Sequence, residues 1–265
     1  MKIYNPEGSK LREDQKKMVD ILVEFDRICR ENHIAWWLDS GTLLGAVRHG
    51  GFIPWDDDMD ICVMRRDYRR LRRILCAYKS DRYVYQCLEN TPDHTNPFGK
   101  FRLIQANDID PKAPRPPYMI GVDVFSIEKT SRFASHLAKF FYQNMQHPTN
   151  YIKSPKLRHL AKRTVEVLNF GLLLPLCRLI GLINPKGQYH YELGSGFYGQ
   201  PYYLKDIFPL GTATFEGVEF PAPRDVDAYL RNLYGDWRKL PSEEQILKDI
   251  HIPDYLKEVV EQDGV

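Results

Sequence analysis

The spacing of apolar residues divides the first half of the chain into alternating helices and strands. Apolar residues three or four positions apart predict amphipathic helices over residues 11–33, with Ser9 as a possible N-cap, and over residues 65–79. A shorter apolar stretch, residues 43–47, suits a short helix. Apolar or alternating runs predict strands over residues 34–38, 60–64, 83–88, 99–104 and 118–127. The chain is therefore expected to begin helix, strand, helix, strand, helix, with further strands after residue 80.

The middle of the chain, about residues 131–195, has a different character. Helical spacing predicts helices at 133–145, 157–168 and 168–183, and the last of these is very apolar. This last stretch is shorter than the roughly 20 residues of a membrane span and contains Pro175 and Arg178, so a buried or surface-dipping helix fits it better. Beyond it we expect a hairpin at 214–220, a helix at 225–237 and a capping box from Ser242 to Gln245. With no internal repeat or low-complexity linker, residues 1–265 are predicted to form one domain with a helical insertion at about 131–195.

Composition narrows the class of protein. The formal net charge of the 265 residues is only +2, which argues against a partner bound mainly through a nucleic-acid backbone. The five cysteines have no paired short spacing, as is typical of reduced thiols in a cytoplasmic protein. The first residues, MKIYNPEGSK, lack the apolar core of a signal peptide. We therefore expect a cytoplasmic location.

Candidate chemistry is concentrated in residues 36–61. Asp58 and Asp60 share one face if the strand at 60–64 begins slightly early, and Asp56 is the next position on that face. Two neighbouring carboxylates repel each other, so one holds a proton unless a cation keeps both ionised, and Mg²⁺ or Mn²⁺ is the cation that carboxylates favour. The alternative is an ordinary solvated acidic turn. Asp123 strengthens the metal interpretation, because a lone aspartate among Ile, Val and Phe is costly to bury without a partner.

A glycine-containing turn precedes the aspartates. Ser40, Gly41 and Thr42 follow the apolar strand at 34–38, and Gly41 would let the backbone approach a ligand closely. The N-terminus of the helix at 43–47 would then face a bound anion. A Gly-Thr turn alone is weak evidence, but beside a pair of aspartates on the next strand it indicates a phosphate site.

These residues also carry a family resemblance. Residues 40–49 (SGTLLGAVRH) and 52–60 (FIPWDDDMD) resemble the signature of the LicD family of phosphocholine transferases, which is similar to the fukutin-related ribitol-phosphate transferases. Residues 206–237 resemble the C-terminal region of the same family, whereas residues 131–195 resemble nothing that we recognise. The resemblance implies an α+β fold: a nucleotidyltransferase-like core with a mixed β-sheet flanked by helices. In that superfamily a third acidic residue lies on a neighbouring strand, at the position that Asp123 matches.

The resemblance and the residues together imply a reaction. A phospho-alcohol, most simply phosphocholine, would pass from a CDP-activated donor such as CDP-choline to a hydroxyl of a cell-surface glycan, and CMP would leave. The acceptor, for example lipopolysaccharide or teichoic acid, would be free or lipid-linked, so peripheral contact with the cytoplasmic face of a membrane is expected. Catalysis is assigned to Asp58, Asp60 and Asp123, metal binding to these three and Asp56, and substrate binding to Ser40, Gly41, Thr42, Arg48, His49 and Lys100. Lys100 has its role only from the resemblance, and an ordinary exposed strand lysine is the alternative.

Two other functions remain open from the sequence. A nucleotidyltransferase that attaches the nucleotide itself to a small molecule, a protein or RNA would use the same carboxylates. A catalytically inactive binding protein on this scaffold would not need all three of them.

Overall fold

The computed structural model describes residues 2–91, 94, 96–110, 119–195, 199–250 and 260–261. At its centre lies a mixed β-sheet, in which β3 and β6 are parallel and the neighbouring pairs are antiparallel. A further strand, β7 (Tyr189–Tyr191), pairs with the last residues of β6. Side by side, the other strands are β2 (Trp36–Leu38), β3 (Asp60–Met64), β6 (Gly121–Lys129), β5 (Gly99–Leu103) and β4 (Tyr83–Gln86).

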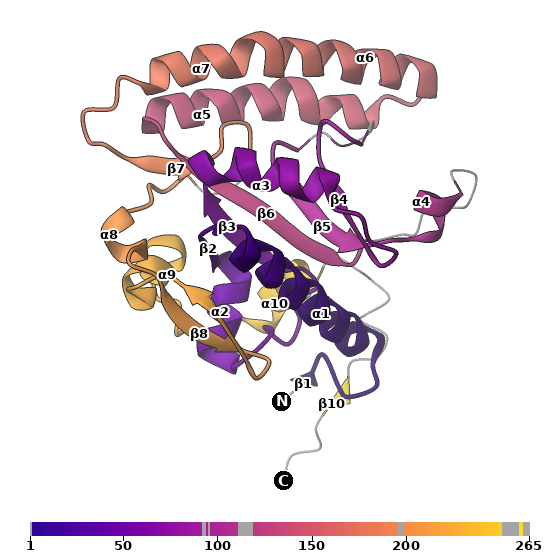
Figure 1. The fold of residues 1–265 in the computed structure, drawn as a ribbon, viewed down its shortest axis with the longest axis vertical. Helices are drawn as coiled ribbons and strands as arrows, with labels where there is room; N and C mark the ends of the chain where they lie inside the picture. The colour runs from indigo at the N-terminus through magenta and orange to yellow at the C-terminus, as the bar shows by residue number, and fades with distance from the viewer. Residues whose placement is uncertain are drawn as a thin grey trace.

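Two amphipathic helices lie across this sheet (Figure 1). Helix α1 (Lys10–Glu31) begins at the cap Ser9, whose hydroxyl accepts from the Arg12 N–H, and buries Phe25 against aromatic rings of β2 and β5. Helix α3 (Arg65–Ala77) buries its apolar stripe and leaves most of its arginines outward. The main core therefore lies between these helices and the strands.

The C-terminal elements gather around α2 (Ser40–His49), at the lower left of Figure 1. The hairpin of β8 (Gly211–Phe215) and β9 (Val218–Ala222) packs on α2 and β2. Helix α9 (Val226–Tyr234) also contacts α2. The smaller elements are α4 (Ala106–Ile109), α8 (Leu204–Ile207), α10 (Glu243–Asp249) and the pair β1 (Lys2–Ile3) and β10 (Val260–Glu261).

A layer of helices covers the end of the sheet where β6 finishes, at the top of Figure 1. It buries a small core of its own around Ala138, Leu174, Cys177 and Leu193. The layer occupies the range predicted to be helical; that it is an insertion into a single domain stays a prediction. Its parts are α5 (Arg132–Phe141), a π-helix (Tyr142–Gln146), a 3-10 helix (His147–Tyr151), α6 (Pro155–Leu168), a second π-helix (Asn169–Leu173) and α7 (Leu174–Gly181).

The α+β class and the mixed sheet flanked by helices are confirmed. One local prediction is wrong: residues 40–42 are not a turn before a helix but the first turn of α2 itself. The reason is Asp39, whose side chain accepts the Ser40 N–H and caps the helix earlier than the apolar spacing indicates. The strand predicted at 34–38 is shorter, β2 beginning at Trp36, and residue 118 of the strand predicted at 118–127 lies outside the described residues.

Candidate active site

Three aspartates from separate parts of the chain meet beside the start of β3. Asp60 is the first residue of β3 and stands directly opposite Asp123 in the parallel pairing with β6. Asp58 precedes the strand by two residues. One carboxylate oxygen of each of the three lies within 4.8 Å of the others. Pairing of two strands, rather than the alternation of one strand, brings the group together.

The backbone holds this meeting point on both sides. The Asp123 N–H donates to the Met59 carbonyl at 2.7 Å, which extends the hydrogen bonding between β3 and β6 to the residue next to Asp58. The Asp60 N–H donates to the Thr42 hydroxyl at 2.8 Å, and the Asp60 carbonyl accepts the Asp39 N–H at 3.1 Å. Asp60 is thus fixed from the first turn of α2 and from the end of β2.

Burial sets the electrostatics of the aspartates. Desolvation, with the charges of Asp58 and Asp123, raises the pKa of Asp60 well above its ordinary value. Desolvation and Asp58 do the same to the pKa of Asp56. Burial also raises the pKa of Asp123. The positive charge of Lys100, whose Nζ lies 3.0 Å from Asp123 Oδ1, opposes this rise. Partly buried carboxylates this close to one another favour either protonation or a bound cation.

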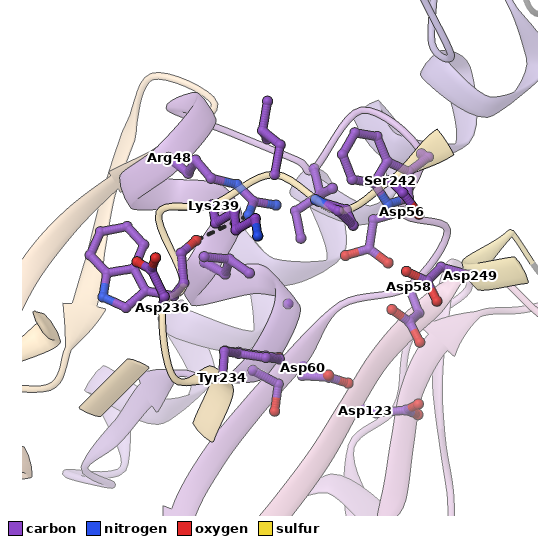
Figure 2. Close-up of a pocket in the computed structure, with 18 of the residues that line it drawn as sticks. Arg48, Asp56, Asp58, Asp60, Asp123, Tyr234, Asp236, Lys239, Ser242 and Asp249 are labelled. Atoms are coloured by element: carbon purple, nitrogen blue, oxygen red, sulfur yellow. Dashed lines mark hydrogen bonds between the residues drawn. The ribbon is translucent and has the colours of Figure 1, made fainter. Parts of the chain in front are cut away.

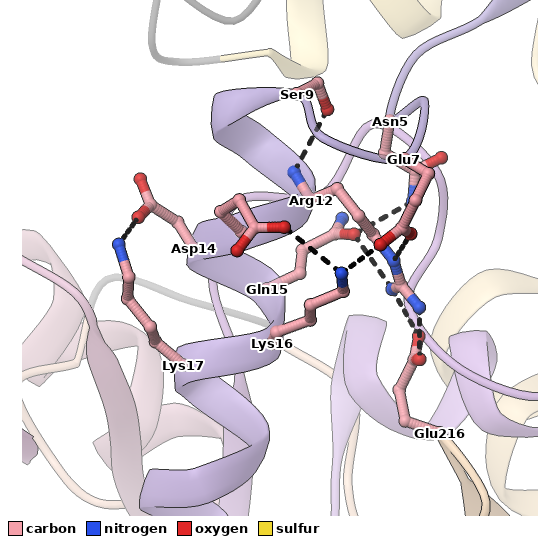
Figure 3. A network of polar contacts seen from close by, with 10 residues as sticks. Asn5, Glu7, Ser9, Arg12, Asp14, Gln15, Lys16, Lys17 and Glu216 are labelled. Atoms are coloured by element: carbon pink, nitrogen blue, oxygen red, sulfur yellow. Dashed lines mark hydrogen bonds and ion pairs between the residues drawn. The ribbon is translucent and has the colours of Figure 1, made fainter.

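A polar network centred on α1 is drawn in Figure 3. It holds the acidic segment, residues 56–58, through bonds to the Asp56 carbonyl and to the Phe52 N–H. Gln15 donates its side-chain N–H to the Asp56 carbonyl at 2.9 Å. Arg12 makes a two-pronged ion pair with Glu216 at 2.9 and 2.7 Å, and Glu216 in turn accepts the Phe52 N–H at 3.2 Å. These bonds tie α1, the turn of the β8–β9 hairpin and the segment before Asp56 into one unit.

The N-terminus of α2 is built around the fully buried Asp39. Its carboxylate accepts hydrogen bonds from Tyr191 at 2.5 Å, from Tyr229 at 2.7 Å and from the Ser40 N–H at 2.8 Å. Ser40 has a left-handed backbone (φ 44°), which is uncommon for a residue with a side chain. A Cβ on Gly41 would lie only 2.8 Å from Asp56 Oδ2, so the absence of a side chain allows the acidic segment to approach α2.

The aspartates form one side of a cavity of about 740 Å³. In Figure 2, Asp56, Asp58, Asp60 and Asp123 line that side, while Arg48 and Lys239 lie across from them. The aromatic side chains that line the cavity are Trp55, Phe125, Tyr191, Tyr234 and Trp237. The cavity therefore combines an acidic wall, cationic groups and flat apolar surfaces.

The residues predicted for substrate binding do not all reach the cavity. Ser40, Gly41 and Arg48 line it. Thr42 is buried beneath it and bonds to the Asp60 N–H, and Lys100 pairs with Asp123 from behind the acidic wall. His49 is exposed at the end of α2, with its ring against Trp55 at 6.2 Å between centroids.

Several residues of the site are not predicted from the sequence. Asp39 had a detectable signal, because it ends the apolar run WWL in the same way that Asp123 interrupts another one. Tyr191, Tyr234 and Lys239 had none: they lie far along the chain, in segments whose sequence shows only ordinary aromatic and charged residues.

The three carboxylates suit a hard divalent cation. They offer only oxygen donors, converge within one coordination sphere, and are buried enough that a cation would relieve their mutual repulsion. Asp56, Asp57 and Asp58 form a second such group on the loop just before β3. Asp58 belongs to both groups, so it is the side chain through which two ions would be linked.

Comparisons with known proteins agree with this geometry. The chain is 26% identical over 255 residues to the lipopolysaccharide cholinephosphotransferase LicD of Haemophilus influenzae, covering 88% of this chain and 93% of that protein. It is 50% identical over 34 residues to the human ribitol 5-phosphate transferase FKRP, which is 13% of this chain and 7% of that protein. The family model described as LicD/FKTN/FKRP, nucleotidyltransferase domain, matches residues 33–169, just over half of the chain and the part that contains all three aspartates. The chain therefore belongs to the LicD/FKTN/FKRP nucleotidyltransferase-domain family.

Proposed function

We propose that this protein transfers a phospho-alcohol, most simply phosphocholine, from a CDP-activated donor to a hydroxyl of a glycan, with release of CMP. The relative from Haemophilus influenzae supports this choice, because the similarity extends over almost the whole of both chains. That relative is named for choline phosphate as the transferred group and lipopolysaccharide as the acceptor. For this protein, both are part of the proposal.

The observation that carries the proposal is the pairing of Asp60 with Asp123 across two parallel strands, with Asp58 beside them. Asp58, Asp60 and Asp123 would hold Mg²⁺ or Mn²⁺, with Asp56 next to them. Such an ion, when bound, neutralises negative charge on the donor's diphosphate and stabilises charge that develops during in-line displacement. This is the reason a transferase needs so many carboxylates beside an anionic substrate.

The other lining residues would orient the donor and the acceptor. Arg48, across the cavity from the aspartates, would pair with phosphate oxygens, and Lys239 lies on the same side. Tyr234 and Trp237 present aromatic surface that fits either the cytosine base or a trimethylammonium group. Asp123 would either share the ion with Asp58 and Asp60 or accept the proton from the acceptor hydroxyl.

The choice of reaction is tested by incubating the purified protein with Mg²⁺, a glycan acceptor and each of CDP-choline, CDP-ethanolamine, CDP-ribitol and CDP-glycerol. Release of CMP together with an acceptor heavier by one phospho-alcohol supports the proposal. An acceptor heavier by a nucleotide would instead identify a nucleotidyltransferase.

The residues are tested in the same assay. Asp58→Asn and Asp60→Asn should each reduce CMP release by at least about a hundredfold while the protein stays folded, as expected when a charge acting on the transition state is lost. Asp20→Asn, on the exposed side of α1, is the matched control and should keep full activity. Undiminished activity in the Asp60 variant would refute the assignment.

A further inference from the structure

The outermost helices of the molecule expose a continuous apolar stripe. In Figure 1, α6 and α7 form the layer farthest from the sheet, with α5 beneath them. Along them, most large exposed apolar residues follow one another at intervals of three, four or seven positions, which places them on one side of the helices. We call this set the apolar stripe; its members are Leu157, Leu160, Val167, Leu168, Leu172, Leu176, Leu179, Leu182 and Ile183.

The opposite face of α7 is packed against the rest of the protein. Leu174 and Cys177 are buried in the small core beneath α7. A Cβ on Gly181 would lie 2.2 Å from the Thr130 hydroxyl, so α7 approaches the end of β6 as closely as a backbone can. The helix is thus held in a fixed orientation, and among the described residues no element covers the stripe.

The exposure of the stripe is high for such large side chains. Leu172 is 58% exposed, Leu179 64%, and Leu182 and Ile183 77% each. Single exposed leucines are normal on a protein surface. A contiguous row of this length instead marks a surface that contacts a membrane or another molecule.

The charge of this part of the chain identifies the partner. Residues 131–187 contain 9 Lys and Arg against 1 Glu, a net charge of +8, which leaves 28 basic against 34 acidic residues, or −6, for the rest. Lys153 and Lys156 lie at one end of the apolar stripe and Lys186 at the other, all exposed. An apolar face flanked by lysines matches the interface of an anionic bilayer, where acyl chains lie beneath negative headgroups.

We propose that the apolar stripe of α6 and α7 docks in the plane of an anionic lipid bilayer. The helical segment Lys156–Gly181 is long and apolar enough to cross a membrane by length and composition alone. An in-plane position fits better, because Arg178 on α7 pairs with Glu128 of β6 at 3.3 Å and the inner face is buried against protein. A span would have to carry those contacts into the hydrocarbon.

The docking surface lies away from the carboxylates. The helical layer follows the last residue of β6, whereas Asp123 is near its first, so the two regions are at opposite ends of the same strand. Changes on the stripe are therefore expected to leave the reaction with soluble substrates unaffected, and this provides an internal check that each variant is folded.

The experiment is co-sedimentation with vesicles of phosphatidylcholine alone and of phosphatidylcholine with 30% phosphatidylglycerol. The wild-type protein should pellet with the anionic vesicles, and high salt or neutral vesicles should weaken binding. The variant Leu172→Glu/Leu176→Glu/Leu179→Glu should partition at least about tenfold less, because three apolar side chains are lost from the interface and three negative charges are gained.

A matched control has the same change of charge elsewhere. Val23→Glu/Ile109→Glu/Leu247→Glu replaces three exposed apolar residues outside the stripe and gives the same net charge. It should bind anionic vesicles like the wild type apart from a small electrostatic loss.

Four results would overturn the proposal. The wild type could stay in the supernatant with anionic vesicles, or the stripe variant could bind as well as the control. Light scattering could show a wild-type dimer that the stripe substitutions dissociate, in which case a second copy of the chain covers the face. Retention of the protein in cell membranes after alkaline carbonate washing would indicate a span.

Discussion

The buried Asp39 site allows a quantitative test of how the N-terminus of α2 is held. Tyr229→Phe removes one hydroxyl that donates to Asp39 at 2.7 Å and accepts from the Trp37 indole N–H at 3.1 Å. A hydrogen bond to a charged group contributes about 1.5–3 kcal/mol, and a buried N–H left without a partner costs about 1–3 kcal/mol. The structure around the lost hydroxyl can relax, so the total effect is smaller than the sum of these two contributions. We therefore expect the free energy of unfolding to fall by about 2–4 kcal/mol.

The loss should also depend on pH. Burial raises the pKa of Asp39, and the bonds from Tyr191 and Tyr229 oppose that rise. Removing one of them raises the pKa of the folded state further, so the destabilisation is greatest at high pH, where Asp39 is ionised, and shrinks as pH falls and the carboxyl is protonated.

Urea unfolding followed by tryptophan fluorescence, at several pH values, measures both effects. Tyr203→Phe is the control, since Tyr203 is 44% exposed, and should stay within about 0.5 kcal/mol of the wild type. A Tyr229→Phe variant as stable as this control would contradict the account of the Asp39 site.

Two further substitutions test the packing around the site. Burial raises the pKa of Glu192 from 4.5 to about 7. The folded state therefore binds this proton more tightly than the unfolded chain does. The stability that this protonated group contributes is lost as the pH rises from about 4.5 to 7. The free energy of unfolding of Glu192→Gln, measured in urea relative to the wild type, should therefore increase by about 3 kcal/mol between about pH 5 and 8, and a constant difference would contradict the burial effect. Gly45→Ala should lower the free energy of unfolding by at least about 1–3 kcal/mol, because a Cβ would lie 2.4 Å from the Gly51 carbonyl. Gly171→Ala, where a Cβ meets open space, should not be destabilising, and equal effects in the two glycine variants would refute the argument.

The sequence predicted the regular elements because their spacing is local. The stripe of α1 and the alternation of β5 are readable within a few residues, and both elements are where the pattern placed them. Boundaries that depend on distant groups were less accurate: α2 begins at Ser40 because Asp39 is held by tyrosines from residues 191 and 229. No pattern near residue 40 contains that information.

The site shows the same division. The approach of Asp58 and Asp60 to Asp123 was anticipated, since acidic residues beside or within apolar strands leave a strong signal. Of the cationic and aromatic side of the cavity only Arg48 was anticipated, because Lys239 and Trp237 reach it only through the packing of the C-terminal segment. The placement of Thr42 beneath Asp60, rather than in the cavity, likewise depends on the helix beginning early.

Binding of Mn²⁺ by titration calorimetry is the most direct test of the central claim, that Asp58, Asp60 and Asp123 together hold a divalent cation. The wild-type protein should bind Mn²⁺, and Asp60→Asn and Asp123→Asn should each weaken binding by at least about tenfold. Asp236→Asn, which removes a carboxylate from the opposite side of the same cavity, should change the affinity little. Equal affinity in the wild type and the Asp60 and Asp123 variants would contradict the claim.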